Sequence, residues 1–237
     1  MMNRSVYTPS AAEAKRFGEL PEWRASHKLN CACAADIEKA IRENFDGMHL
    51  NEGCAKPVID KYGFSRVRWV LANTLTNKRE DGRFSQQNRQ WLSARRIPWD
   101  DHRFDFVVES HPAVLDGFIN EVRAEWDKLG LYDNRHIIPE NDEKLDYEGR
   151  VLIFSADSMN ESHLHPEEQL FYAESGFGCS PNASGTKIFG QFLWDGERCH
   201  ITRADVVGAI RDECLPDWAR DKLEDIGDGE DEGMVMS

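Results

Sequence analysis

Two histidines and the carboxylates that follow them form the stretch of the sequence best suited to chemistry. The run is SHLHPEEQL, in which His163 and His165 are two residues apart and Glu167 and Glu168 follow. In an extended segment this spacing points both imidazoles the same way, and imidazole with carboxylate is a ligand set for transition metals. The pattern predicts a metal site at His163, His165 and Glu167, which a metal-assisted hydrolase or nuclease would use, with Glu168 as the alternative carboxylate. The same residues, with Pro166 in a first turn, are also typical of a helix N-terminus.

The most glycine-rich run, ESGFGCSPNASGTKIFG at residues 174–190, raises the question of phosphate binding. A Walker loop ends in Gly-Lys-Ser/Thr, whereas here Gly185 is followed by Thr-Lys. A dinucleotide fingerprint lies between a strand and a helix, whereas EEQLFYAES before this run is typical of a helix and a β-rich run follows it. We therefore expect no cofactor, and interpret the run as a helix end and turn or as a loop that contacts a partner. Its candidate partner-binding residues are Gly176, Gly178, Asn182 and Gly185.

Two tryptophans and the cysteines are further candidates for binding or catalytic groups. Trp99 and Trp218 are candidate exposed anchors for a partner, because tryptophan is enriched in interface hot spots. Cys31 and Cys33 are about 200° apart around a helix axis, so they are poorly placed to share a metal. Cys33 falls on the apolar stripe of its helix and is interpreted as a core residue. No catalytic residue is assigned.

The first 131 residues have the periodicity of a helical domain. The run PEWRASHKLNCACAADIEKAIRENF predicts a long helix over residues 21–45. The run SHPAVLDGFINEVRAEWDKLG predicts another, with Ser110 as its cap, Pro112 in its first turn and Gly130 at its end. The apolar stripe of the first is Leu29, Cys33, Ile37, Ile41 and Phe45, and that of the second is Leu115, Phe118, Ile119, Val122, Trp126 and Leu129.

The sequence changes character after a polar segment at residues 132–148, which we expect to be a linker. Residues 149–226 then predict a small α+β domain that contains a β-hairpin over 186–203, in which Asp195-Gly196 favours a tight type I′ turn. Residues 227–237 predict a disordered acidic tail. The expected fold class is α+β and mostly helical.

The formal net charge of −14 narrows the classes of partner. Such a surface repels a phosphate backbone, and the basic run RRIPWDDHR is diluted by acids and apolar residues. We therefore expect no direct nucleic-acid binding, and a basic or nucleic-acid-binding protein as partner. The apolar runs are too short to span a membrane and the first residues lack the apolar stretch of a secretion signal, which favours the cytoplasm. The oligomeric state stays open.

Several phrases together resemble a known family. They are GELPEWRASHKLNCACAADIEKAIRENFDGMHLN, GFSRVRWVLANTL, DGRFSQQNRQWL and SHPAVLDGFINEVR, within residues 5–130. They are similar to an uncharacterised domain family carried by conjugative and integrative elements of gut Firmicutes and their relatives. The resemblance implies a bacterial or phage setting and a mobile genetic element, and it supplies no catalytic residues.

These observations favour a non-enzymatic accessory protein of a mobile element or phage that acts by protein binding. Its acidic surface is suited to inhibiting a host-defence nucleic-acid-binding protein, in the manner of an anti-CRISPR or antirestriction protein. Two alternatives stay open. One is the metal-assisted hydrolase or nuclease that uses His163, His165 and Glu167 or Glu168, and the other is a structural docking module of a conjugation apparatus.

Overall fold

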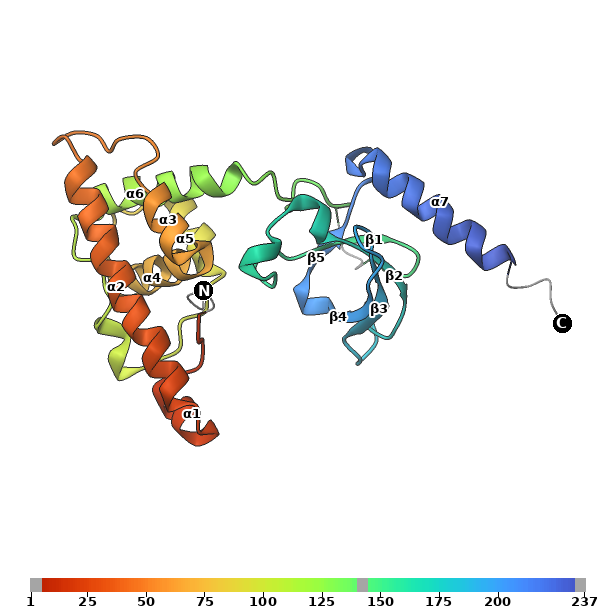
Figure 1. Cartoon of the computed structure of the whole chain (residues 1–237), viewed down its shortest axis with the longest axis horizontal. Coiled ribbons are helices and arrows are strands. Elements are labelled where there is room, and N and C mark those ends of the chain that lie inside the picture. Colours follow the sequence, from red (N-terminus) through yellow and green to blue (C-terminus); the bar gives the residue numbers. More distant parts are fainter. Residues whose placement is uncertain (1–5, 140–144, 233–237) are drawn as a thin grey trace. The chain divides into compact units, whose positions relative to one another are not determined.

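The chain divides into two compact units, Met1–Lys128 and Leu129–Ser237, in a computed structural model (Figure 1). The structure describes residues 6–139 and 145–232, with side chains up to residue 226. The division falls close to the end of the predicted helical part at residue 131. The first unit is helical and the second holds an antiparallel sheet, which confirms the mostly helical α+β fold class.

The helices of the first unit pack around one buried helix, α4. It is buried on nearly every side from Phe64 to Leu75, which is the pattern of a helix at the centre of a domain. Neighbouring helices α2, α3 and α5 contact it directly. The elements of this unit are α1 (Ala11–Phe17), α2 (Leu20–Asn44), α3 (Lys56–Tyr62), α4 (Phe64–Asn77), α5 (Gln86–Ser93), the 3-10 helix η1 (Asp101–Phe104) and α6 (Pro112–Asp127).

Helix α6 shows how closely the apolar stripe determines packing. Leu115, Phe118 and Ile119 are fully buried, as the spacing predicts, because they share the face turned to the core. The start of the helix differs from the prediction. His111 rather than Ser110 is the N-cap, without a side-chain hydrogen bond, because a proline at the first helical position fixes the entry of the chain.

The second unit is built on a five-stranded sheet in the order β4-β3-β2-β1-β5, in which all neighbouring strands are antiparallel. Strand β4 ends at Thr202 and β5 begins at Val206, yet these strands lie at opposite edges. A flat sheet would hold its edges about 19 Å apart. The four residue steps between them span at most about 14 Å. The sheet must therefore curl. Its strands are β1 (Val151–Phe154), β2 (Leu170–Ser175), β3 (Lys187–Phe192), β4 (Arg198–Thr202) and β5 (Val206–Ala209).

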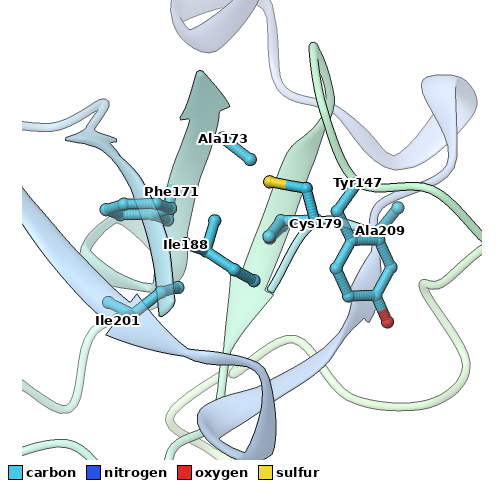
Figure 2. Packing of buried hydrophobic residues seen from close by; sticks show 8 residues of the cluster. Tyr147, Phe171, Ala173, Cys179, Ile188, Ile201 and Ala209 are labelled. Carbon is cyan, nitrogen blue, oxygen red and sulfur yellow. The ribbon is translucent and has the colours of Figure 1, made fainter. Parts of the chain in front are cut away.

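Side chains of alternating strand positions form two apolar clusters in this unit. Leu152 and Phe171 point into one cluster, and Val151, Ile153 and Leu170 into the other. The second cluster also takes up apolar side chains of helix α7 (Asp217–Glu232). Figure 2 shows the first cluster, whose buried members are Tyr147, Leu152, Phe171, Ala173, Cys179, Ile188, Ile201 and Ala209.

Two local predictions in the second unit are wrong. The run EEQLFYAES forms a short 3-10 turn and then strand β2, because Leu170 and Phe171 pair with β1 and bury completely. Strands β3 and β4 are joined by the five residues 193–197 instead of a two-residue type I′ turn. Such a turn needs positive φ at both central residues, and among the described residues no non-glycine has positive φ. The loop is closed by Gly196 N–H donating to the carbonyl of Phe192.

The ends of the second unit also differ from the expected linker and tail. Within residues 132–148, the Ile138 amide donates to the Ala209 carbonyl, and Tyr147 lies in the core. The expected linker is therefore part of this unit on both sides of residues 140–144, which lie outside the described part of the chain. Its backbone is irregular, so its buried apolar side chains do not recur at a helical or strand period and were not predicted from the sequence. Helix α7 continues to Glu232, so residues 227–232 of the expected tail are helical, and 233–237 are outside the described residues.

Candidate functional site

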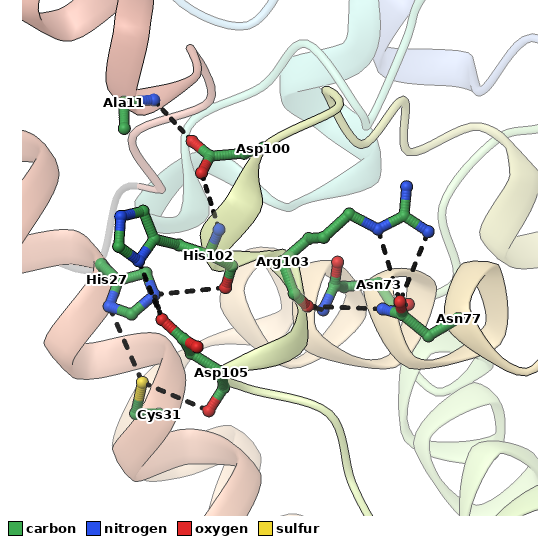
Figure 3. Close-up of polar contacts among 9 residues, drawn as sticks. All are labelled: Ala11, His27, Cys31, Asn73, Asn77, Asp100, His102, Arg103 and Asp105. Atoms are coloured by element: carbon green, nitrogen blue, oxygen red, sulfur yellow. Dashed lines mark hydrogen bonds and ion pairs between the residues drawn. The ribbon is translucent and has the colours of Figure 1, made fainter.

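The segment between α5 and α6 carries the densest group of functional side chains in the first unit. Asp100 caps η1, its Oδ1 accepting from the His102 amide at 2.8 Å, and its Oδ2 accepts from the Ala11 amide at 2.6 Å (Figure 3). On the other side, the Asn73 and Asn77 side-chain amides donate to the carbonyl of Arg103. The segment is thus held to α1 and α4 by hydrogen bonds that each join a side chain to a main-chain group.

Two histidines and one aspartate meet at this segment. His102 Nδ1 lies 3.0 Å from Asp105 Oδ2, and His27 Nε2, on α2, lies 3.4 Å from the same oxygen. Their ligand atoms all lie within 4.8 Å of one another. Across residues 6–139 and 145–226, this is the one group of three or more metal-ligating side chains so close together. We call it the His27 cluster.

Aromatic rings and a thiol hold the His27 cluster in place. The Trp23 ring stacks on His27 with centroids 4.9 Å apart and lies equally close to His102. The Cys31 sulfur, one turn along α2, lies 3.8 Å from His27 Nδ1 (Figure 3). Burial, together with the charge of Asp105, raises the pKa of the Cys31 thiol, so this thiol is neutral at pH 7.

A small pocket adjoins the His27 cluster. It encloses about 30 Å³, which is room for one or two water molecules and too little for an organic substrate. The lining includes both histidines of the cluster. Its apolar walls come from Trp23, Trp69, Ile97, Pro98 and Phe106.

An exposed aromatic surface lies on the same segment. Trp99 is 77% exposed and Phe104 60% exposed, and the Arg103 guanidinium lies over both rings, 4.3 and 5.1 Å from their centroids. We call these three residues the Trp99 surface. Asp100 and Asp101 adjoin it in sequence, so residues 97–106 carry three carboxylates against one guanidinium. The predicted anchor Trp99 is therefore exposed, whereas the second predicted anchor, Trp218, packs against the apolar cluster under α7.

The residues of the predicted metal site are only partly brought together. His163 Nδ1 pairs with Glu168 Oε2 at 2.6 Å, beside a pocket of about 230 Å³ lined also by Phe154 and Trp194. His165 and Glu167 are exposed and do not line this pocket. The structure therefore joins one predicted histidine to the alternative carboxylate, and the closer grouping of potential ligands is the His27 cluster.

The glycines of the predicted partner loop lie close to other atoms of the second unit, two of them against the main chain of residues 186–187 and one against a side chain. A Cβ on Gly176 would lie 2.5 Å from the Lys187 carbonyl oxygen, and one on Gly178 2.4 Å from that of Thr186. A Cβ on Gly185 would contact the Phe177 side chain at 2.5 Å. These three glycines permit close packing. Asn182 is exposed at the loop, together with Phe177 at 78%.

The His27 cluster could not be predicted from the sequence because His27 is 75 residues away from His102 along the chain. Two local signals mark it. His27 and Cys31 have the i, i+4 spacing that places side chains on one helix face, and His102 and Asp105 have the i, i+3 spacing of one helical turn. Each pair alone is common, and only the fold brings the two together.

Fold and site together define a helical domain with a histidine–carboxylate cluster, followed by a curled five-stranded sheet. The chain belongs to the family described as Protein of unknown function (DUF3849), whose model matches residues 6–127. The match covers the first unit almost from end to end. No curated protein and no solved structure matches the chain. Within the described residues, no helix has both the length and the apolar character needed to cross a membrane.

Proposed function

We propose that the protein is a non-enzymatic binding protein that recognises a basic protein partner through the Trp99 surface. The observation that carries this proposal is the exposure of Trp99 and Phe104, with the Arg103 guanidinium lying over both rings. Tryptophan and arginine are the side chains most enriched among residues that dominate interface energetics. Large exposed aromatics cost free energy in water, and a partner that covers them would recover it.

The backbone of the Trp99 surface is fixed before any partner arrives. Hydrogen bonds from Asn73 and Asn77 hold the Arg103 carbonyl, and Phe106 is buried in the core directly after the surface. A rigid surface loses little conformational entropy on association, which favours affinity. The stacked guanidinium further restricts the two aromatic side chains.

The charge of the chain indicates the kind of partner. Asp100, Asp101 and Asp105 lie close to Trp99 and Phe104 in sequence, and the whole chain carries a formal net charge of −14. Opposite charge on a partner speeds encounter and selects against acidic surfaces. A basic, nucleic-acid-binding protein of the bacterial cytoplasm fits these requirements as the partner. For this protein itself, we favour the role of an inhibitor that a mobile element carries and that acts on a host-defence protein. A docking role within a conjugation apparatus predicts a basic partner from the element itself.

Affinity capture with the full chain tests this proposal. The tagged wild-type protein and the Trp99→Ala variant are used to capture proteins from a bacterial lysate at low and at high salt, with quantitative mass spectrometry as the readout. We expect a basic protein that is captured by the wild type, is lost at high salt, and binds the variant at least roughly 30-fold more weakly when purified, the effect of a hot-spot loss of about 2 kcal/mol.

The matched control is Trp194→Ala, because Trp194 is also an exposed tryptophan, 44% exposed, but lies in the second unit. It should capture the same partner as the wild type. If a purified partner binds the Trp99→Ala variant as tightly as the wild type, the Trp99 surface is not the interface. Binding that is insensitive to salt would contradict the electrostatic part of the proposal.

A further inference from the structure

We infer that His27, His102 and Asp105 form a binding site for one divalent transition-metal ion, with Zn²⁺ as the best-matched ion. The inference concerns the His27 cluster alone and does not depend on the Trp99 surface being an interface. It differs from the site predicted at His163 and His165, which lies in the second unit.

The distances within the cluster match a metal site closely. The three ligand atoms form a triangle with sides of 3.0 and 3.4 Å and a third side of at most 4.8 Å. The centre of such a triangle lies at most about 2.4 Å from each atom, against zinc–nitrogen and zinc–oxygen bonds of about 2.0 to 2.2 Å. A small rotation of the side chains would bring all three into bonding distance.

The donor set selects the class of ion. Two imidazole nitrogens and one carboxylate oxygen suit Zn²⁺ and its first-row neighbours, whereas Mg²⁺ and Ca²⁺ prefer oxygen ligands throughout. Three protein ligands also leave one coordination position for water. The side chains of His102 and Asp105 are about half exposed, at 49% and 47%, so water has access to that position.

Groups around the cluster support the ligands as outer partners of metal sites do. If His27 binds through Nε2, its Nδ1 faces the Cys31 sulfur at 3.8 Å, which orients the ring. Cys31 in turn lies 3.7 Å from the Asp105 carbonyl oxygen, and Trp23 covers both imidazoles on one side. The arrangement thus links helix α2 to the segment that carries the Trp99 surface.

The cluster has a second state that needs no metal. Without a metal, His102 Nδ1 can donate to Asp105 Oδ2 at 3.0 Å and His27 Nε2 can donate to the His102 carbonyl oxygen at 3.4 Å, through the same two nitrogens that would bind the ion. A metal ion bound at these nitrogens would displace both protons, and each proton would move to the other nitrogen of its own ring. Because the cluster can also exist without a metal, the inference is tested by measuring whether the protein binds one equivalent of metal.

The test uses the tag-free full chain after treatment with a chelator. Isothermal titration with Zn²⁺ should give one saturable site, and the Zn²⁺-loaded protein should unfold at a higher temperature than the metal-free protein. We expect His102→Ala and Asp105→Asn each to weaken binding at least tenfold. These positions are chosen because their exposure makes misfolding avoidable, and the circular dichroism of the metal-free variants should equal that of the wild type.

Matched controls come from the second predicted site. His163→Ala and His165→Ala should bind Zn²⁺ as the wild type does. A second readout is the visible absorption of bound Co²⁺, which should disappear in His102→Ala and persist in His163→Ala. Absence of saturable binding by the wild type would overturn the inference. So would equal binding by His102→Ala and Asp105→Asn, or loss of binding confined to the His163 and His165 variants.

Discussion

The guanidinium of Arg203 lies over the ring of Tyr147, 4.0 Å from its centroid. The same side chain donates to three main-chain carbonyls, those of Gly178 and Cys179 through Nη1 and that of Leu145 through Nη2. One residue thus joins the turn between β4 and β5 to the glycine-rich run and to the segment before β1. The run that raised the question of phosphate binding is held by an arginine of its own chain.

Replacing Arg203 with methionine should destabilise the second unit by about 2 to 4 kcal/mol. The variant keeps much of the aliphatic stem but loses the charged hydrogen bonds and the cation–π contact. Because the two units need not unfold together, amide hydrogen exchange of peptides from each unit is the measurement. Arg198→Met is the control, since Arg198 is 68% exposed and its ion pair with Glu174 contributes at most about 1 kcal/mol. Equal effects of the two substitutions would contradict the role given to Arg203.

Gly190→Ala should be the most damaging small substitution in the sheet. A Cβ there would lie 1.9 Å from the carbonyl oxygen of Tyr172 on the neighbouring strand, and main-chain atoms cannot move aside without breaking the ladder. We expect a loss of at least about 3 kcal/mol of unfolding free energy in the second unit. Gly82→Ala, where nothing lies within 4 Å, should stay within about 1 kcal/mol of the wild type. Thermal unfolding of both variants checks the contrast.

Asn30→Leu should destabilise the first unit through its partner, Arg66. Both side chains are buried, and Arg66 Nη1 donates to Asn30 Oδ1 as well as to Ser26. Removing the acceptor weakens the solvation of a buried charge, which costs about 2 to 4 kcal/mol. The double variant Asn30→Leu with Arg66→Met should recover part of that loss, because the charge is then gone. Hydrogen exchange of α2 and α4 measures both, and a double variant less stable than the single one would refute this explanation.

Asp36 should stabilise the first unit at neutral pH and lose that contribution at acidic pH. The hydrogen bond from Lys61 lowers the pKa of Asp36 below its ordinary value of 3.8, and Tyr62 adds a second donor. A carboxyl group whose pKa is lowered by folding contributes its full stabilisation above its unfolded-state pKa. It loses that contribution as the pH falls through the folded-state pKa. Because the pair is partly exposed, Asp36→Asn should cost at most about 1 kcal/mol at pH 7. Denaturation at a series of pH values should show the two proteins converging as the pH falls below 3.8 and through the lowered pKa of Asp36. A difference that persists unchanged there would contradict the assignment.

Long periodic helices were predictable from the sequence, and short apolar runs were not. Helix α2 carries its stripe over 25 residues, so Cys33, Ile37 and Ile41 bury as expected. The run EEQLFYAES holds too few apolar positions to distinguish a helix from a strand. Its strand conformation depends on pairing with β1 and β3, which local sequence does not encode.

The candidate site was harder to predict for a related reason. Trp99 could be named as an anchor because tryptophan is enriched in interface hot spots. The His27 cluster could not, because it exists only where η1 crosses α2. The paired histidines at residues 163 and 165 formed the stronger pattern locally, yet the chain turns between them and separates their side chains into different surroundings.

The strand order of the curled sheet also suggests the order in which its strand pairs form during folding. Hairpins β2–β3 and β3–β4 join neighbouring segments, whereas β1 meets β5 only after the chain has closed a loop of about fifty residues. Contacts between distant segments tend to form late, so the pairing of Leu152 with Ala209 is expected to follow the folding transition state. Weakening that seam would then speed unfolding and leave refolding nearly unchanged. The pairing of β1 with β5 is therefore expected to form last during folding and to be lost first during unfolding.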